Sequence, residues 1–131
     1  MACVANAFYL ARTSGRIMAT GVTEVRLAEH ERGGIRRAVV RACDEMRAAW
    51  RRIILFGSRA DPLRRGGDID LLIELDPACQ TDRFALTQKL RLALEDELGE
   101  QRVDVVVDDG HGEEAFLQRA RATGVELWSN T

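Results

Sequence analysis

The stretch IILFGSRADPLRRGGDIDLLIEL, from Ile53 to Leu75, places two apolar segments on either side of a loop rich in glycine and arginine. The apolar run Ile53–Phe56 is short and ends at Gly57, which is typical of a buried strand that leads into a turn. A second strand is predicted from Asp68 to Leu75, and it begins with acids at positions where a strand usually carries apolar residues. The acids and the loop therefore need an explanation other than packing.

The paired acids indicate a cation site. Side chains alternate across a strand, so Asp68 and Asp70 point to one face while Ile69 points to the other. Two carboxylates about 4 Å apart repel by roughly 4 kcal/mol at an effective dielectric of about 20, so a shared cation is needed to keep both ionised. Asp104 is the single acid in the apolar strand predicted over Val103–Val107, and its burial is expected to be costly unless it reaches the same cation. Three carboxylates are hard oxygen ligands, which favours Mg²⁺ or Mn²⁺ and a phosphate substrate.

The loop after the first strand supplies groups that suit a phosphate. Gly57 lets the backbone approach a ligand closely, Ser58 carries a hydroxyl, and a helical turn after them would present free backbone N–H groups to anionic oxygens. Arg59, Arg64 and Arg65 add charge-assisted contacts in this interpretation, and the alternative is that they are simply solvated. A triphosphate site without a Walker lysine is therefore predicted.

The rest of the chain predicts helices around these strands. An amphipathic helix is expected from Leu27 to Trp50, weakened near its start by two glycines. A second helix is expected over Gln80–Leu98, with a cap near Thr81 and a stop at Gly99, and a last short helix over Glu113–Thr123. The pattern predicts an α/β (α+β) fold in which helices flank a mixed sheet.

Several other conspicuous residues receive structural interpretations. Glu74 continues the alternation of the aspartates, but a position facing solvent is expected for it. His30 and His111 are expected on the surface, and Trp50 and Trp128 in packing contacts.

Composition limits the chain to one domain of ordinary globular balance, with 131 residues, 46% hydrophobic and 31% charged. The net charge of −2 lacks the basic excess of nucleic-acid-binding proteins, so no direct nucleic-acid partner is expected. Cys3, Cys43 and Cys79 are too widely spaced for a CxxC motif, which favours a reducing cytoplasm. Residues 1–20 are expected to be a loosely ordered extension, neither signal peptide nor membrane anchor, before a domain over residues 21–131.

The segment FGSRADPLRRGGDIDLLIEL together with VDVVV resembles the GS-loop-DxD-D signature of the DNA polymerase β nucleotidyltransferase superfamily, and the length resembles its minimal nucleotidyltransferases. The resemblance covers Leu27–Trp128 and implies the polymerase β-like fold, a mixed sheet flanked by helices. It also implies that Gly57 and Ser58 contact nucleotide phosphates. The catalytic and metal-binding triad that it implies consists of Asp68, Asp70 and Asp104.

Two departures from the family pattern concern the loop. The family often reads GSRARG and SDxD, whereas this chain has GSRADP and GGDID, and its loop is about one residue shorter than the commonest spacing. The triad itself is untouched, so the departures bear on the contacts to phosphate and base.

Many minimal nucleotidyltransferases are antitoxins encoded beside a HEPN-domain toxin, typically an RNase, and some transfer AMP from ATP to a toxin tyrosine. The resemblance thus implies a cytoplasmic, Mg²⁺-dependent protein adenylyltransferase that uses two ions of Mg²⁺ or Mn²⁺ and ATP. It further implies a HEPN-domain partner in a hetero-oligomer, with no role for a membrane. The alternative is an antitoxin that masks its toxin by binding alone.

Two other functions are less favoured. Nucleotidylation of an antibiotic or another small molecule is weaker because a single domain leaves no second one to build an acceptor pocket. The chain is not itself the toxin, since the HEPN RNase signature R-x(4-6)-H is absent and Arg26 and His30 are one residue too close.

Overall fold

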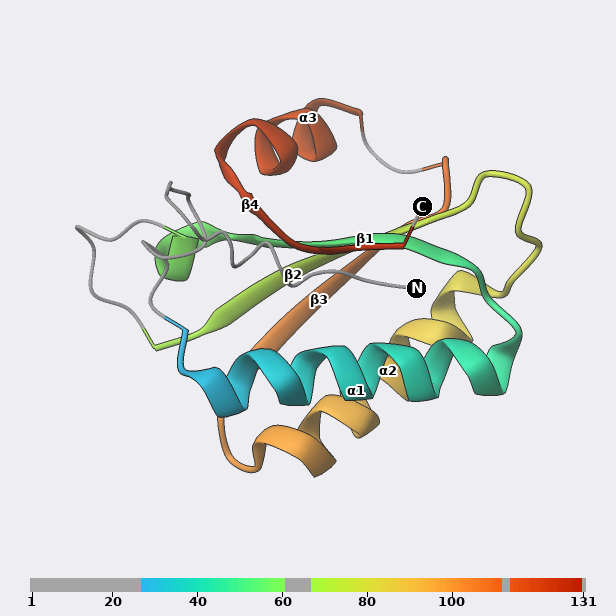
Figure 1. The fold of residues 1–131 in the computed structure, drawn as a ribbon. Coiled ribbons are helices and arrows are strands. Elements are labelled where there is room, and N and C mark those ends of the chain that lie inside the picture. Colours follow the sequence, from blue (N-terminus) through green and yellow to red (C-terminus); the bar gives the residue numbers. More distant parts are fainter. Residues whose placement is uncertain (1–26, 61–66, 112–113, 131) are drawn as a thin grey trace.

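The computed structural model describes residues 27–60, 67–111 and 114–130, and the structural statements below concern these residues. The elements, in chain order, are α1 (Glu29–Met46), β1 (Trp50–Phe56), a 3₁₀ turn (Gly57–Ala60), β2 (Ile69–Leu75), α2 (Arg83–Leu98), β3 (Val103–Asp108), α3 (Glu114–Thr123) and β4 (Val125–Ser129) (Figure 1). The predicted N-terminal extension, Cys3, Arg64 and Arg65 lie outside the described residues.

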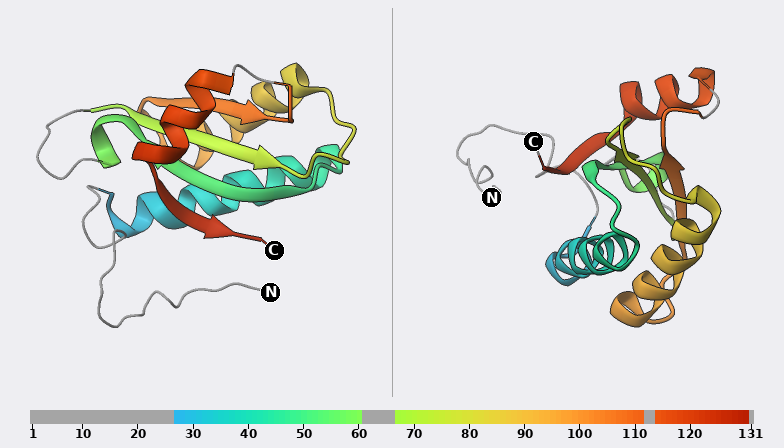
Figure 2. Two further views of the ribbon diagram at one scale, coloured as in Figure 1. Left: turned by 90° about the horizontal axis from the view of Figure 1, so that it is seen from above. Right: turned by 90° about the vertical axis from the view of Figure 1, so that its right-hand side faces the viewer.

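In the described residues the strands form one mixed sheet in the order β3-β2-β1-β4. Strand β1 is antiparallel to both β2 and β4, whereas β2 and β3 are parallel. A parallel pair needs a crossover connection, and α2 supplies it. Helices α1 and α2 cover one face of the sheet and α3 lies on the other, as the additional views in Figure 2 show. The predicted α+β fold with helices flanking a mixed sheet is confirmed.

Strand β2 divides its side chains between the two faces of the sheet. Ile69, Leu71 and Ile73 are fully buried in the core beneath α1 and α2. Leu72 packs in a second cluster with Leu117 of α3. Each such buried side chain contributes about 1.5–3 kcal/mol relative to exposure, so the alternation is strongly fixed. The residues that alternate with the buried set, Asp70 and Glu74 among them, consequently lie on the α3 face.

Helix α1 is shorter than the periodicity predicts. Arg47 adopts the left-handed conformation at φ 55°, and its backbone N–H donates to the carbonyl of Asp44, which closes the last turn. Trp50 therefore does not belong to the helix but begins β1, where it is buried. Its expected packing role is confirmed, although in a different element.

Local polar contacts decide two further details of the helices. Helix α2 is capped by Asp82, whose carboxylate accepts a hydrogen bond from the backbone N–H of Ala85 at 3.1 Å, and not by Thr81. One of the two glycines that were expected to weaken α1, Gly34, has a packing role. A Cβ atom at this position would lie 2.8 Å from Cδ2 of Leu98 in α2. The stop of α2 at Gly99 is confirmed, at φ 69°.

An ion-pair network on the α3 face corrects the expectation that Glu74 faces solvent. Both carboxylate oxygens of Glu74 accept from Arg52 of β1, at 2.7 and 2.9 Å, and Oε2 also accepts from Nε of Arg121 at 2.6 Å. Arg121 also donates to the buried Asp108 of β3. The network ties α3 to three strands.

We expect Glu74→Gln to lower the free energy of unfolding at neutral pH by about 1–3 kcal/mol, because it removes charge-assisted hydrogen bonds. Burial raises the pKa of Glu74, but the hydrogen bonds from Arg52 and Arg121 outweigh it and hold the pKa below the ordinary value. The stabilisation is thus present above the ordinary glutamate pKa and lost as pH falls through the depressed one. The free energies of unfolding of wild type and variant, measured in urea, should therefore become equal in acid. The control is Glu95→Gln, at an exposed position of α2.

Candidate active site

Three aspartates meet at one end of the sheet. Asp70 of β2 and Asp104 of β3 are directly opposite each other in the parallel pair, and Asp68 lies two residues before Asp70. The pKa of Asp70 lies above its ordinary value, first because burial removes water from the carboxyl and then because Asp104 and Asp68 add like charge. The structure thus brings the sequence-predicted acids into electrostatic contact.

The expectation that Asp104 is buried is wrong. Its side chain is exposed, near the start of the edge strand β3. Asp68 is also exposed, and Asp70 is partly buried. The buried acid of β3 is instead Asp108, which is paired with Arg121. The cost of burying a charge is therefore no argument for a cation at Asp104. The remaining argument is that Asp104 lies beside two other carboxylates.

The three acids offer ligands that suit a hard cation, but they do not form a closed cation site. Among the described residues, no three carboxylate, imidazole or thiol groups lie close enough together to hold a metal ion. Oδ2 of Asp68 faces Arg102 instead, 3.9 Å from its Nε atom, in an exposed ion pair. All three side chains offer carboxylate oxygens, which Mg²⁺ and Mn²⁺ prefer. Asp68 therefore has a cationic side chain, that of Arg102, close to one of its carboxylate oxygens.

Gly57 lies against the central carboxylate. It has φ 77°, a conformation that favours glycine, and it follows Phe56, the cross-strand neighbour of Asp70. A Cβ atom at this position would lie 2.3 Å from Oδ2 of Asp70, closer than any real contact. Glycine is thus required both by the backbone and by the approach of Asp70. The loop for which phosphate binding was predicted therefore lies directly beside the acid pair.

The other predicted loop residues have different outcomes. The helical turn expected after Gly57 is present as the 3₁₀ turn, and Ser58 belongs to it, but the position of its side chain lies outside the described part of the structure. Arg59, predicted to bind nucleotide, hydrogen-bonds to Glu31, Gly67 and Gln101 in this structure.

Sequence reasoning missed two features next to the acids. Arg102 lies two residues before Asp104, so the alternation that pairs the aspartates could have identified it as a cation on the same face. Phe56 and Phe116 pack edge to face, with ring centroids 5.8 Å apart, and join β1 to α3. No pattern in the sequence pairs these two rings, because they lie in separate elements.

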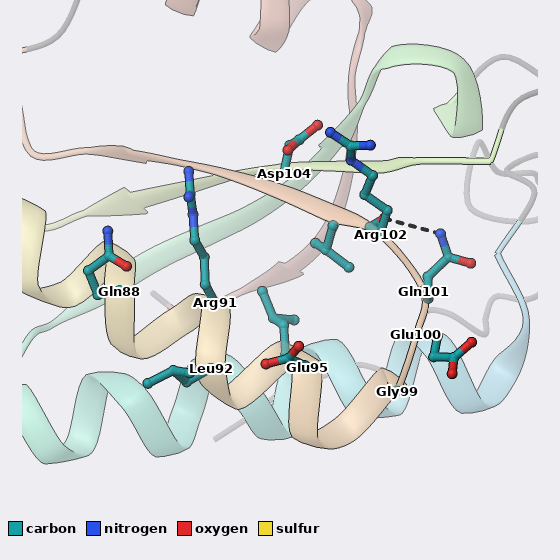
Figure 3. Close-up of a pocket in the computed structure, with 11 residues that line it drawn as sticks. Gln88, Arg91, Leu92, Glu95, Gly99, Glu100, Gln101, Arg102 and Asp104 are labelled. Atoms are coloured by element: carbon teal, nitrogen blue, oxygen red, sulfur yellow. Dashed lines mark hydrogen bonds between the residues drawn. The ribbon is translucent and has the colours of Figure 1, made fainter.

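A groove of about 430 Å³ lies between α2 and β3 and is bordered by Leu92 and Glu95 of the helix. Figure 3 shows that the side chains of Asp104 and Arg102 point away from α2, although both residues border the groove. The groove is therefore adjacent to the carboxylates but separated from them by β3.

Comparisons with known proteins find similarity only among solved structures. No protein-family model matches the chain, and no curated protein matches it. Seven chains of solved structures match. One, from a structure described as the toxin-antitoxin with AMP-PNP, is 24% identical, covers 72% of this chain and 73% of its own length, and has a TM-score of 0.48. Another, from the toxin-antitoxin MntA-HepT, is 23% identical, covers 74% of this chain and 71% of its own length, and has a TM-score of 0.46. What this chain does is inferred from its own residues.

A helix that crosses a bilayer needs about 20 predominantly apolar residues, and the described segments contain the helices α1, α2 and α3. None of them is both long enough and apolar enough to cross a bilayer.

Proposed function

We propose that this chain is a Mg²⁺-dependent nucleotidyltransferase of the minimal class in the polymerase β superfamily. One observation carries the proposal: Asp70 and Asp104 are opposed on adjacent strands, with Asp68 beside them, directly against a glycine turn that only glycine fits. Packing does not require this arrangement. Burial, and after it the like charges of Asp104 and Asp68, raise the pKa of Asp70. Neighbouring carboxylates beside a loop that can bind phosphate are the groups that a site for a metal-nucleotide complex needs.

The reaction would transfer AMP from ATP to a hydroxyl group. The acceptor oxygen attacks the α-phosphorus, a new P–O bond forms, and the bond from that phosphorus to the bridging oxygen of the β-phosphate breaks, so that pyrophosphate leaves. Asp104 is more exposed than Asp70, its neighbour on β2, and it would receive the proton of the acceptor hydroxyl. Asp68, Asp70 and Asp104 would hold Mg²⁺ or Mn²⁺, which when bound neutralises the charge on the transferring phosphoryl group.

The glycine turn would hold the remaining phosphates. The positive φ of Gly57 lets the backbone turn directly beside Asp70, so the backbone N–H groups of the turn would face the triphosphate, and Ser58 would add its hydroxyl. Holding the β- and γ-phosphates fixes the line along which pyrophosphate leaves. This role predicts that loop geometry controls the rate of transfer as well as nucleotide affinity.

The acceptor would be a hydroxyl of another macromolecule, because in the described part of the structure Asp68 and Asp104 are exposed, Asp104 on the edge strand β3, where a large partner can reach them. The family resemblance makes this partner a HEPN-domain toxin and the acceptor a tyrosine, within a cytoplasmic hetero-oligomer. The chain would then act as an antitoxin by adenylylating the toxin.

A second candidate is an antitoxin that only masks its toxin. The observation in its favour is the incomplete cation site among the described residues, in which Arg102 lies 3.9 Å from a carboxylate oxygen of Asp68. A masking protein needs continued contact with its target, whereas an enzyme leaves a lasting modification. This difference separates the two functions.

We expect incubation of this chain and Mg²⁺-ATP with its cognate HEPN-domain protein to add one nucleoside monophosphate to the partner. Intact-mass spectrometry measures the addition. The partner should remain inactive as an RNase after this chain has been stripped away, because the phosphodiester link to the acceptor oxygen persists.

The control is Asp70→Asn, which removes a carboxylate of the site without altering the exposed surface of the helices. An unmodified partner that regains RNase activity on separation, with wild type and variant protecting it equally, would establish masking and refute transfer.

A further inference from the structure

We infer that Arg59 is a positioning residue that holds together the three chain segments of the candidate active site, an inference that rests on the proposed function. We call the side chains of Glu31, Arg59 and Gln101, together with the carbonyl group of Gly67, the latch. Its role differs from the nucleotide contact that the sequence predicts for Arg59.

The guanidinium of Arg59 reaches three separate parts of the chain. Its Nη1 atom donates to Oε1 of Glu31 at 3.2 Å. Its Nη2 atom donates to the carbonyl oxygen of Gly67 at 3.3 Å and to Oε1 of Gln101 at 3.2 Å. Nε2 of Gln101 donates to the same carbonyl of Gly67. A planar fork with several fixed donors can satisfy these acceptors together, which a lysine ammonium on its single flexible stem cannot.

Each contact lies next to a part of the site. Arg59 belongs to the 3₁₀ turn after β1, and Gly67 immediately precedes Asp68. Gln101 lies three residues before Asp104, on the segment that enters β3. The latch therefore joins the phosphate turn to the starts of both strands that carry the acids.

The contact with Glu31 anchors the latch to helix α1. Glu31 is in the first turn of α1, and its Oε1 atom also accepts from the backbone N–H of Ala28 at 2.9 Å. The side chains of Arg59 and Glu31 are only 13% and 12% exposed, so solvent and salt screen this ion pair little. An exposed pair would be a poor restraint, whereas this one has few alternative positions.

The latch also continues into the backbone ladder between the acid-bearing strands. The carbonyl of Arg102 accepts from the backbone N–H of Ile69 at 3.0 Å and from Nε2 of Gln101 at 3.1 Å. Ile69 lies between Asp68 and Asp70, so the latch supports the register in which the carboxylates meet. Supporting contacts behind metal ligands typically change metal affinity by about 10–100-fold.

Two readouts that do not require transfer test this inference: Mn²⁺ binding to the nucleotide-free protein, by calorimetry, and amide hydrogen exchange at Ile69. The variants are Arg59→Lys and Gln101→Leu, and the control is Arg37→Met, which removes an exposed ion pair between α1 and α2. We expect both latch variants to weaken Mn²⁺ binding by about tenfold or more and to speed exchange at Ile69. The control should change neither.

The outcomes separate this inference from the proposed function. If the latch variants weaken ATP binding but leave Mn²⁺ affinity and Ile69 exchange unchanged, Arg59 contacts phosphate and the inference is overturned. If wild type binds neither Mn²⁺ nor ATP, the proposed function fails, and Ile69 exchange still decides whether the latch holds this segment. Because Gln101 is partly exposed, its variant remains informative if Arg59→Lys does not fold.

Discussion

Asp70→Asn is expected to lower the rate of nucleotidyl transfer by about 10³-fold or more and to raise the melting temperature of the metal-free protein. A bound metal contributes several kcal/mol of transition-state stabilisation, and each 1.4 kcal/mol corresponds to a tenfold change in rate. Asparagine keeps the shape of the side chain but removes its charge. The loss of activity should therefore occur without loss of the fold.

The gain in stability follows from the direction of the pKa shift. Burial and the charges of Asp104 and Asp68 raise the pKa of Asp70, so the ionised carboxylate destabilises the metal-free folded state at neutral pH. This penalty is fully present above the raised pKa and disappears as pH falls below the ordinary aspartate pKa. The difference in melting temperature should be largest at neutral pH and vanish in acid.

Thermal melting in the presence of a chelator measures this effect, with Asp96→Asn as the control. Asp96 is an exposed aspartate of α2 that pairs with Arg41 of α1, on the opposite face of the sheet from Asp70. A marked fall in melting temperature for Asp70→Asn would mean that the carboxylate is structural, and the metal argument would be wrong.

Gly57→Ala is expected to lower transfer by about 10²-fold or more and the free energy of unfolding by about 1–3 kcal/mol. Two physical causes add together here. The left-handed φ of 77° is strained for any residue with a Cβ atom, and that atom would lie 2.3 Å from Oδ2 of Asp70. Either the turn or the carboxylate must move, and both belong to the proposed site.

The matched control for Gly57→Ala is Gly110→Ala. Gly110 also has a left-handed φ, of 94°, but a Cβ atom there meets nothing within 4 Å. It therefore isolates the backbone strain from the contact with Asp70. Urea unfolding measures the loss of stability of each variant, and Mn²⁺ titration measures its metal affinity. Only Gly57→Ala should lose metal affinity. Equal behaviour of the two variants would exclude the close approach of Gly57 to Asp70 as the cause.

The strand residues show why part of the site was predictable. Alternation along β2 requires no knowledge of distant segments, and it correctly placed Ile69, Leu71 and Ile73 on one face and Asp70 on the other. The glycine that ends β1 was recognisable for the same reason, since a turn after an apolar run is a local property. Strand β4 was not identified, because its five residues acquire their role only by pairing with β1.

Two of the errors concern residues whose environment is supplied by other elements. Glu74 was expected to face solvent, but α3 brings Arg121 onto it. Asp104 was expected to be buried, but of the two acids of β3 only Asp108, which pairs with Arg121 of α3, is buried. Neither strand order nor helix placement can be read from alternation, because both depend on which apolar faces pack together after the chain has folded.

Local sequence thus determined the fold class, the two-residue spacing of the acids on one face and the glycine turn that precedes them, because each depends on covalent geometry and neighbouring side chains. Tertiary structure alone decided that Asp104 lies opposite Asp70 and that Gly57 touches its carboxylate. It also decided that the guanidinium of Arg59 bonds to groups from 8 to 42 positions away along the chain. Such contacts form only when distant segments are brought together by burial of the shared core, so no local pattern contains them.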